Sequence, residues 1–232
     1  MDPRDPNREQ LVKVARALGD LSSEVVFLGG ATVGLLITDP AARSVRPTKD
    51  VDVVVEVASY AEYQVKIGSA LRAAGFVECT DEGAPICAWR VDGVRVDVMP
   101  TDAAVLGFTN PWYQQAIATA STHDIGGTTI RLISAPCFLA TKFAAFADRG
   151  DSDYYASHDL EDILAVVDGR PSLIDEIAAA DQTVRSYLVQ SAGRLLADSE
   201  FLNALPGHVD RGRDRVVAAR LLTLAKGSES AP

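Results

Sequence analysis

One stretch, RPTKDVDVVVEV at residues 46–57, constrains the fold of this chain more than any other. The β-branched run after Asp52 is typical of a buried β-strand. Because side chains alternate between the two faces of a strand, Asp50 and Asp52 point the same way. Two carboxylates placed this close repel one another unless a cation binds between them. The stretch therefore predicts a sheet that carries a cation site at the start of one strand.

The rest of the first half alternates between predicted helices and predicted strands. Apolar residues at helical spacing predict helices over residues 8–20 and 59–76, and a further helix can begin directly after Gly29-Gly30. Runs of β-branched and apolar residues, bounded by turn residues, predict strands. These strands lie at residues 24–30, 51–57 and 128–134, with a hairpin over 86–100 that turns at Asp92-Gly93.

After Ser134 the pattern becomes helical. The predicted helical stretches are residues 135–150, 157–169, 172–205 and 213–226. We therefore predict an α/β (α+β) protein. Its mixed-sheet catalytic core lies at residues 1–134, and an all-helical C-terminal domain lies at 135–232.

Composition excludes several classes of protein. Hydrophobic residues make up 47% of the chain, which is enough for a sizeable core, and the net charge of −10 argues against a broad nucleic-acid-binding face. No apolar run reaches membrane-spanning length, and the N-terminus lacks the apolar segment of a signal peptide. The three cysteines show no metal-ligand spacing. We therefore predict a cytoplasmic protein with reduced cysteines and no membrane partner.

A third aspartate, Asp97, lies within the second hairpin strand between apolar neighbours. A carboxylate in mid-strand is disfavoured, and it is costly if it is buried unpaired. If this strand lies beside that of Asp50 and Asp52, the three carboxylates converge and need a metal ion. Carboxylates without nearby histidine or cysteine select Mg²⁺ or Mn²⁺. The alternative is that Asp97 pairs with Arg95 or Arg90, while Asp50 caps a strand and Asp52 is solvated.

A Gly-Gly turn precedes the aspartates in the chain. The sequence FLGGA at residues 27–31 predicts a strand, two glycines and then a helix, so free backbone N–H groups are open to a phosphate. It is not a Walker loop, because no Gly-Lys-Ser/Thr follows, and it does not fit the Rossmann fingerprint. The alternative is a simple tight turn.

The order of these features resembles the nucleotidyltransferase superfamily, which has the DNA polymerase β-like fold. That family combines a Gly-Gly or Gly-Ser turn, an Asp-x-Asp pair and a later carboxylate, matched here by Gly29-Gly30, Asp50-x-Asp52 and Asp97. One branch of the family has the pattern R-x-[ST]-x-D-hydrophobic-D. Its positions are filled here by Arg46, Thr48, Asp50 and Asp52.

The second half resembles the AbiEii-like toxin nucleotidyltransferases, which include the MenT group. In that group, one helix carries a lysine and then a basic residue, which Lys142 and Arg149 match here. The next helix opens with an acidic stretch, which Asp159 and Asp162 match. The resemblance covers residues 24–165, and the last helices match no family pattern.

The resemblance implies a role for each matched residue. Asp50 and Asp52 would bind Mg²⁺ on the triphosphate, and Asp97 would bind a second metal ion and help to activate the acceptor. Nucleotide contacts would come from Gly29, Gly30, Thr32, Arg46, Thr48, Lys142 and Asp159. Lys142 would neutralise triphosphate charge, and Asp159 would orient Lys142 or touch the base or ribose. The alternatives are a lysine that merely reaches the surface and an aspartate that stabilises a helix N-terminus.

By the same resemblance, the chain transfers a nucleoside monophosphate from an NTP to a hydroxyl, as in toxin–antitoxin or abortive-infection systems. The acceptor would be a tRNA 3′ end, and a cognate antitoxin would be a partner. Alternatives are an antitoxin-like enzyme that transfers AMP to protein, an aminoglycoside-type small-molecule enzyme, and a catalytically silent binding module. The best local basic patch is interrupted by Asp210 and Asp214, so a solvated helix face is the preferred interpretation. Its members are Arg211, Arg213, Arg215, Arg220 and Lys226.

Overall fold

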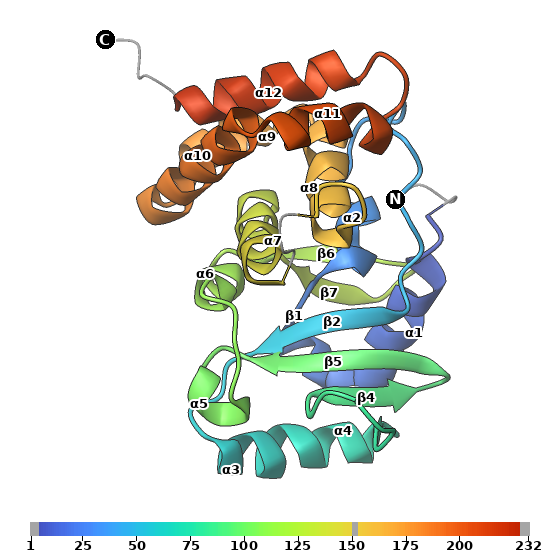
Figure 1. Cartoon of the computed structure of the whole chain (residues 1–232). Helices are drawn as coiled ribbons and strands as arrows, with labels where there is room; N and C mark the ends of the chain where they lie inside the picture. Colours follow the sequence, from blue (N-terminus) through green and yellow to red (C-terminus); the bar gives the residue numbers. More distant parts are fainter. Residues whose placement is uncertain (1–4, 150–152, 228–232) are drawn as a thin grey trace. The chain divides into compact units, whose positions relative to one another are not determined.

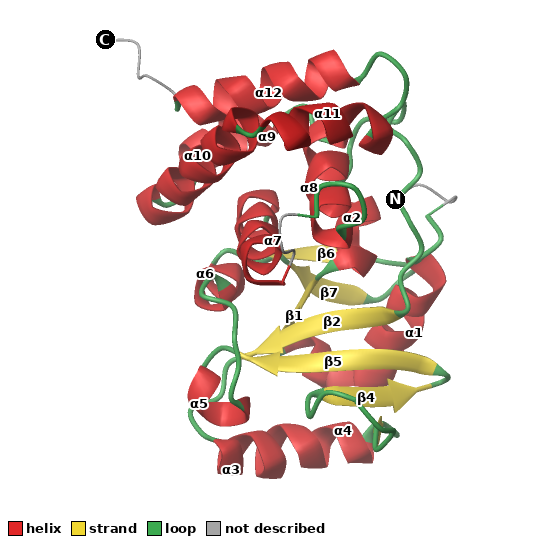
Figure 2. Ribbon diagram, viewed as in Figure 1, coloured by secondary structure: helices red, strands yellow, loops and turns green. Residues whose placement is uncertain are grey.

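The computed structural model describes residues 5–149 and 153–227, and it divides the chain into two compact units. The first unit covers the chain up to Gly34 and again Arg46–Ser134, whereas the second covers Leu35–Val45 and the chain from Ala135 onward. A mixed sheet with helices forms the first unit and helices alone form most of the second, which confirms the predicted α/β (α+β) class (Figures 1 and 2).

The sheet of the first unit has seven strands in the described part of the chain, in the order β3-β4-β5-β2-β1-β7-β6. Its two central strands, β2 and β5, run parallel, while β1 pairs antiparallel with β2 and parallel with β7. The strands are β1 (Val25–Leu28), β2 (Asp50–Val55), β3 (Val77–Glu78), β4 (Ala88–Val91), β5 (Val94–Pro100), β6 (Ser121–Asp124) and β7 (Thr129–Leu132).

The predicted hairpin forms from β4 and β5, with Val91 paired to Val94 across the turn. Asp92 and Gly93 both have positive φ, as a two-residue hairpin turn requires. In the sheet, β5 lies between β4 and β2. The parallel pairing of β5 with β2 brings Asp97 beside the strand that begins with Asp50.

The helices of the first unit begin where local signals predict. Helix α1 (Arg8–Leu18) lies against β2 and β5 (Figure 1). The stretch predicted as one helix over 59–76 forms α3 (Tyr60–Glu62), a π-helical segment (Tyr63–Gly68) and α4 (Ser69–Ala73). Ser59 accepts a hydrogen bond from the Glu62 backbone N–H, and the Glu62 carboxylate accepts one from Ala58, so the start is capped reciprocally. The short helices α5 (Ala103–Leu106) and α6 (Tyr113–Ala118) complete this unit.

The second unit is built from helices α7 (Ala135–Arg149), α8 (His158–Gly169), α9 (Leu173–Ala179), α10 (Gln182–Ala197), α11 (Ser199–His208) and α12 (Asp214–Lys226). The predicted helical stretch at 172–205 is divided at two aspartates. Asp181 accepts a hydrogen bond from the Thr183 N–H and Asp198 accepts one from the Glu200 N–H. An aspartate that caps a new helix competes with continuation of the preceding one.

The basic patch predicted at the C-terminal end of the chain is partly used inside the second unit. Arg213 donates to the Asp168 carboxylate at 2.8 Å, and Arg220 donates to the Val167 carbonyl at 2.7 Å. Both therefore satisfy the C-terminal end of α8. The interpretation as a fully solvated helix face is wrong for these two arginines, although Arg211 and Arg215 are exposed. In the described part of the chain, no helix is long and apolar enough to cross a membrane.

Candidate active site

The register of β2 and β5 brings the predicted aspartates together. Asp52 is the direct partner of Asp97, and Asp50 is the direct partner of Arg95. Partners on neighbouring strands share a face of the sheet, so these four charged side chains form one cluster, which we call the carboxylate face. On the opposite face, Val51, Val53, Val96 and Val98 are completely buried. The apolar core therefore fixes the register, and the register fixes the carboxylate face.

Asp97 already has a cationic partner. Arg95 donates from Nε to Asp97 Oδ1 at 2.9 Å and from Nη2 to Oδ2 at 2.7 Å. The Asp97 side chain is 12% exposed, and the Arg95 side chain is 35% exposed. The hydrogen bonds to Asp97 raise the pKa of Arg95 above its ordinary value, despite partial desolvation. The pairing that we considered as an alternative to a metal ligand is therefore present in this structure.

The donor set suits a hard divalent cation in kind. Asp50, Asp52 and Asp97 offer carboxylate oxygens, which Mg²⁺ and Mn²⁺ prefer. Across residues 5–149 and 153–227, however, no three side chains of histidine, cysteine, aspartate or glutamate are arranged to hold a metal ion. Both carboxylate oxygens of Asp97 accept hydrogen bonds from Arg95, so a cation bound by all three carboxylates would compete with this arginine. The residues fit such a cation if it prevails in this competition.

Gly29 is required by the carboxylate of Asp52. Its φ of +75° favours glycine, and a Cβ built on it would lie 2.6 Å from Asp52 Cγ. Gly29 therefore leaves the space in which the Asp52 side chain lies.

The predicted helix after the glycines begins as a 3₁₀ turn and is short. Residues Gly30–Thr32 form a 3₁₀ turn, and α2 (Val33–Leu36) is four residues long. Thr32 is fully buried, and its hydroxyl donates to the Gly29 carbonyl at 2.9 Å. Thr32 thus closes the turn, and its role as a phosphate ligand stays a prediction. So short a helix also gives little dipole to attract a phosphate.

The stretch before the aspartates is tied to the start of α1. Asn7, which is completely buried, accepts a hydrogen bond from the Thr48 N–H at 2.8 Å and donates to the Arg46 carbonyl at 2.9 Å. The Thr48 hydroxyl accepts from Gln10 at 2.8 Å and donates to the Asp50 carbonyl at 3.1 Å. Asn7 and Gln10 therefore position the entry to β2. The sequence gives no sign of this, because the partners lie about forty residues apart.

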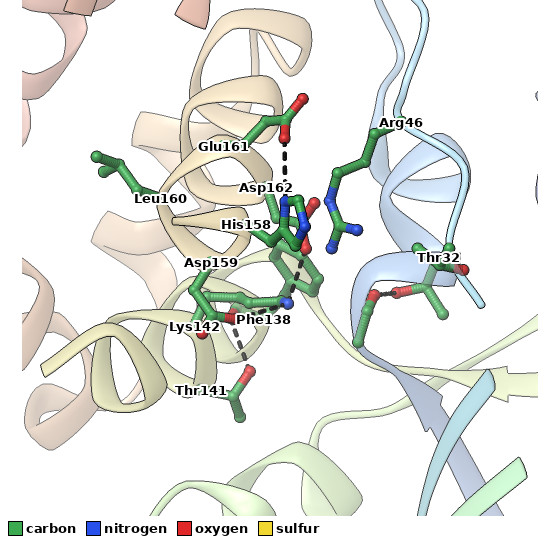
Figure 3. Close-up of polar contacts among 12 residues, drawn as sticks. Thr32, Arg46, Phe138, Thr141, Lys142, His158, Asp159, Leu160, Glu161 and Asp162 are labelled. Carbon is green, nitrogen blue, oxygen red and sulfur yellow. Dashed lines mark hydrogen bonds and ion pairs between the residues drawn. The ribbon is translucent and has the colours of Figure 1, made fainter. Parts of the chain in front are cut away.

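In the second unit, Lys142 lies between two carboxylates. Its ammonium contacts Asp159 Oδ1 at 2.9 Å and Asp162 Oδ2 at 2.7 Å, and all three side chains are at most 10% exposed (Figure 3). The lysine comes from α7 and the aspartates from the first two turns of α8, which Ser157 caps. Lys142 is therefore neither a surface lysine nor an isolated cation. Arg149 ends α7, but its side chain lies outside the described part of the structure.

Burial and ion pairing act in opposite directions on Lys142. Burial lowers the pKa of its ammonium group, whereas the charges and hydrogen bonds of Asp162 and Asp159 raise it by more. The net pKa is above the ordinary value for lysine, so the side chain stays charged at neutral pH. The ion pair joins α7 to α8 within the second unit.

A pocket of about 340 Å³ also lies in the second unit. Its two histidines, His158 and His208, are fifty residues apart in the chain. They line it together with Arg43, Tyr155 and Glu161. His208 contacts the Tyr154 carbonyl at 2.6 Å, so one of its ring nitrogens has a fixed partner.

No protein-family model matches the chain, and no curated protein matches it in sequence. Among solved structures, a nucleotidyltransferase-like antigenic protein from Paracoccidioides brasiliensis is similar. It shares 22% identity over 87% of this chain and 94% of its own, with a TM-score of 0.49. The solution structure of the antibiotic-resistance factor ANT(2'')-Ia is also similar. It shares 12% identity over 82% of this chain and 93% of its own, with a TM-score of 0.48.

A crystal structure of ANT(2'')-Ia with adenylyl-2''-tobramycin matches at 13% identity over 81% of this chain and 97% of its own, with a TM-score of 0.44. The structural neighbours thus include a nucleotidyltransferase-like protein.

Proposed function

We propose that this chain is a divalent-metal-dependent nucleotidyltransferase that moves a nucleoside monophosphate from an NTP to a hydroxyl group. One observation carries the proposal. Asp50, Asp52 and Asp97 lie on one face of two adjacent parallel strands, and the space around Asp52 requires glycine at position 29. Three carboxylates on one face cost free energy unless a cation offsets their repulsion. Such a cost is expected at a functional site.

The carboxylates would act as follows. A divalent cation held by Asp50, Asp52 and Asp97 would stabilise the negative charge that develops on the transferred phosphate. Asp97, the least exposed of the three, would accept the proton of the acceptor hydroxyl. The hydroxyl oxygen then bonds to the α-phosphorus, the bond from that phosphorus to its bridging oxygen breaks, and pyrophosphate leaves.

Roles for the remaining predicted residues follow from their surroundings. Gly29 and Gly30 would leave backbone N–H groups for phosphate oxygens, and Arg46 and Thr48 would support the entry to β2. Lys142 already forms ion pairs with Asp159 and Asp162, so its charge would only in part be available to neutralise the triphosphate. Its position therefore favours a role in holding α8 on α7, with Asp159 as its direct partner.

The negative charge of the chain bears on the chemical class of the acceptor. The chain has a net charge of −10, and Arg213 and Arg220 are engaged at the end of α8. Both features weigh against a tRNA 3′ end and against a toxin of the AbiEii-like branch, because RNA binding requires accessible cations. An acidic protein attracts a cationic, hydroxyl-bearing small molecule instead. We therefore favour such an acceptor, with tRNA or protein as the competing possibilities.

Label transfer tests this proposal. The purified full chain is incubated with each α-³²P-labelled NTP and Mg²⁺, and with total tRNA, a protein lysate or an aminoglycoside mixture. Asp52→Asn should lose transfer by at least about a hundredfold, because removing one metal ligand weakens the charge stabilisation. Asp92→Asn is the matched control, since Asp92 lies in the exposed hairpin turn and asparagine tolerates its positive φ. Transfer that survives Asp52→Asn would overturn the assignment.

A further inference from the structure

Arg95 belongs to the carboxylate face, but the proposed reaction gives it no role. It lies directly opposite Asp50 in the register and binds Asp97 through two hydrogen bonds. A guanidinium fork on a carboxylate is a strong and geometrically specific pair. Arg95 therefore takes the place at Asp97 that a metal ion would need.

A comparison with Arg90 shows that this pairing is specific. Arg90 on β4 is the direct register partner of Arg95, so the two arginines are neighbours on the sheet. Arg90 nevertheless pairs with Asp81 at 3.0 Å, where both side chains are more than half exposed. The Arg95 partner, in contrast, is 12% exposed. Of these two neighbouring cations, only Arg95 is bound to the carboxylate face.

The energetics favour exchange rather than permanent pairing. Without a divalent cation, Arg95 offsets part of the repulsion among Asp50, Asp52 and Asp97. Its side chain is 35% exposed, so water can solvate the guanidinium when it leaves. A divalent cation brings twice the charge and binds more than one carboxylate at once. The cation can therefore displace Arg95, but only after overcoming the two hydrogen bonds to Asp97.

We propose that Arg95 is an internal counter-ion that holds Asp97 in the metal-free protein and leaves it when a divalent cation binds. Arg95 is a positioning residue by this account. It keeps Asp97 in place and sets the cation concentration at which the three-carboxylate site forms. This inference rests on the proposed function, because it assumes that Asp97 is a metal ligand.

The test measures Mn²⁺ binding to the full chain. Binding is monitored by electron paramagnetic resonance, in which the signal of free Mn²⁺ decreases as the ion binds. Arg95→Met should bind Mn²⁺ about tenfold more tightly than wild type, because the competing hydrogen bonds are gone. Without metal, Arg95→Met should also unfold at a lower temperature than wild type. Addition of Mn²⁺ should raise its unfolding temperature by more than it raises that of wild type. Arg90→Met removes the same charge one strand away and should change Mn²⁺ affinity less than about twofold.

A second variant protects the test against misfolding. Arg95→Lys keeps the charge but loses the fork, so its Mn²⁺ affinity should fall between wild type and Arg95→Met. In the Asp97→Asn background, Arg95→Met should no longer tighten binding. Equal affinity in wild type and Arg95→Met would overturn the inference. So would equal tightening in Arg95→Met and Arg90→Met.

Asp52→Asn separates failure of this inference from failure of the proposed function. If Asp52→Asn abolishes Mn²⁺ binding and Arg95→Met leaves it unchanged, the inference on Arg95 is wrong and the metal site stands. If Asp52→Asn binds Mn²⁺ as wild type does, the carboxylate face is not the metal site. The proposed function and the inference then both fail.

Discussion

Gly29 and Asp52 lie so close that no side chain can be added at the glycine without displacing the carboxylate. A Cβ at position 29 would lie 2.6 Å from Asp52 Cγ and 2.8 Å from its Cβ. Gly29 directly follows β1, and Asp52 on β2 is paired with Leu28 at the end of β1. The glycine turn therefore shapes the carboxylate face directly.

Gly29→Ala should destabilise the protein by about 2–4 kcal/mol, from backbone strain and from the collision with Asp52. Mn²⁺ affinity should also fall, because the Asp52 carboxylate is displaced. Gly93→Ala is the matched control, since it has φ of +77° and open space around its Cβ position. It should lose stability but keep metal affinity. Urea unfolding and Mn²⁺ titration check both expectations, and equal metal affinity in the two variants would count against the role given to Gly29.

Lys142→Met should destabilise the chain by about 3–5 kcal/mol, because two buried carboxylates lose their shared cation. Adding Asp162→Asn should restore part of this stability, since it removes one of the stranded charges. Equilibrium urea unfolding measures both effects. Lys13→Met serves as a control, because Lys13 forms an exposed pair with Glu9. If the double variant were less stable than Lys142→Met alone, the ion-pair account would be contradicted.

Stability should fall in alkali partly through Cys87. Burial first, and the nearby charge of Asp97 second, raise the pKa of this thiol from 9.0 to about 12. The pKa of Cys87 is higher in the folded protein than in the unfolded chain. The contribution of this thiol to the free energy of unfolding is therefore fully present below pH 9, and it is lost as the pH rises from 9 to 12. Cys87→Ala should therefore flatten the decline of unfolding free energy over that range. Parallel curves for Cys87→Ala and wild type would contradict the prediction.

Asn7→Ala should loosen the entry to β2. It removes the hydrogen bonds to Thr48 and Arg46 and should cost about 1–3 kcal/mol. Because Thr48 also holds the Asp50 backbone, Mn²⁺ affinity should fall a few-fold. Asn7→Asp keeps the oxygen that accepts from Thr48 and should retain more of that affinity. Unchanged affinity in Asn7→Ala would show that the tether does not position Asp50.

Part of the carboxylate face could be predicted because its signal is local: strand alternation places Asp50 and Asp52 together. The position of Asp97 could be predicted only on condition that its strand pairs with theirs, because that parallel pairing is long-range. The sequence also left open the pairing of Asp97 with Arg95 or Arg90. Only the three-dimensional arrangement decides between them, because both arginines lie within reach along or across the hairpin.

Other parts of the site could not be predicted, for physical reasons. The link from Asn7 to Thr48 depends on tertiary packing and has no periodic signal. The helix predicted after Gly29-Gly30 begins with a 3₁₀ turn, which the sequence did not indicate. Residues Leu35–Val45 belong with the helical unit because backbone bonds join Thr38 and Asp39 to Gly169, which local propensity does not encode.

Nucleotidyl transfer is distinguished from other reactions by the position of the label in the nucleotide. The chain is incubated with Mg²⁺, the acceptor mixture and the preferred NTP, labelled with ³²P at either the α or the γ position. Nucleotidyl transfer predicts that label from the α position enters the acceptor, that γ label leaves as pyrophosphate, and that Asp52→Asn abolishes the first. Transfer of γ label to the acceptor, or α-label transfer that persists in Asp52→Asn, would contradict the account.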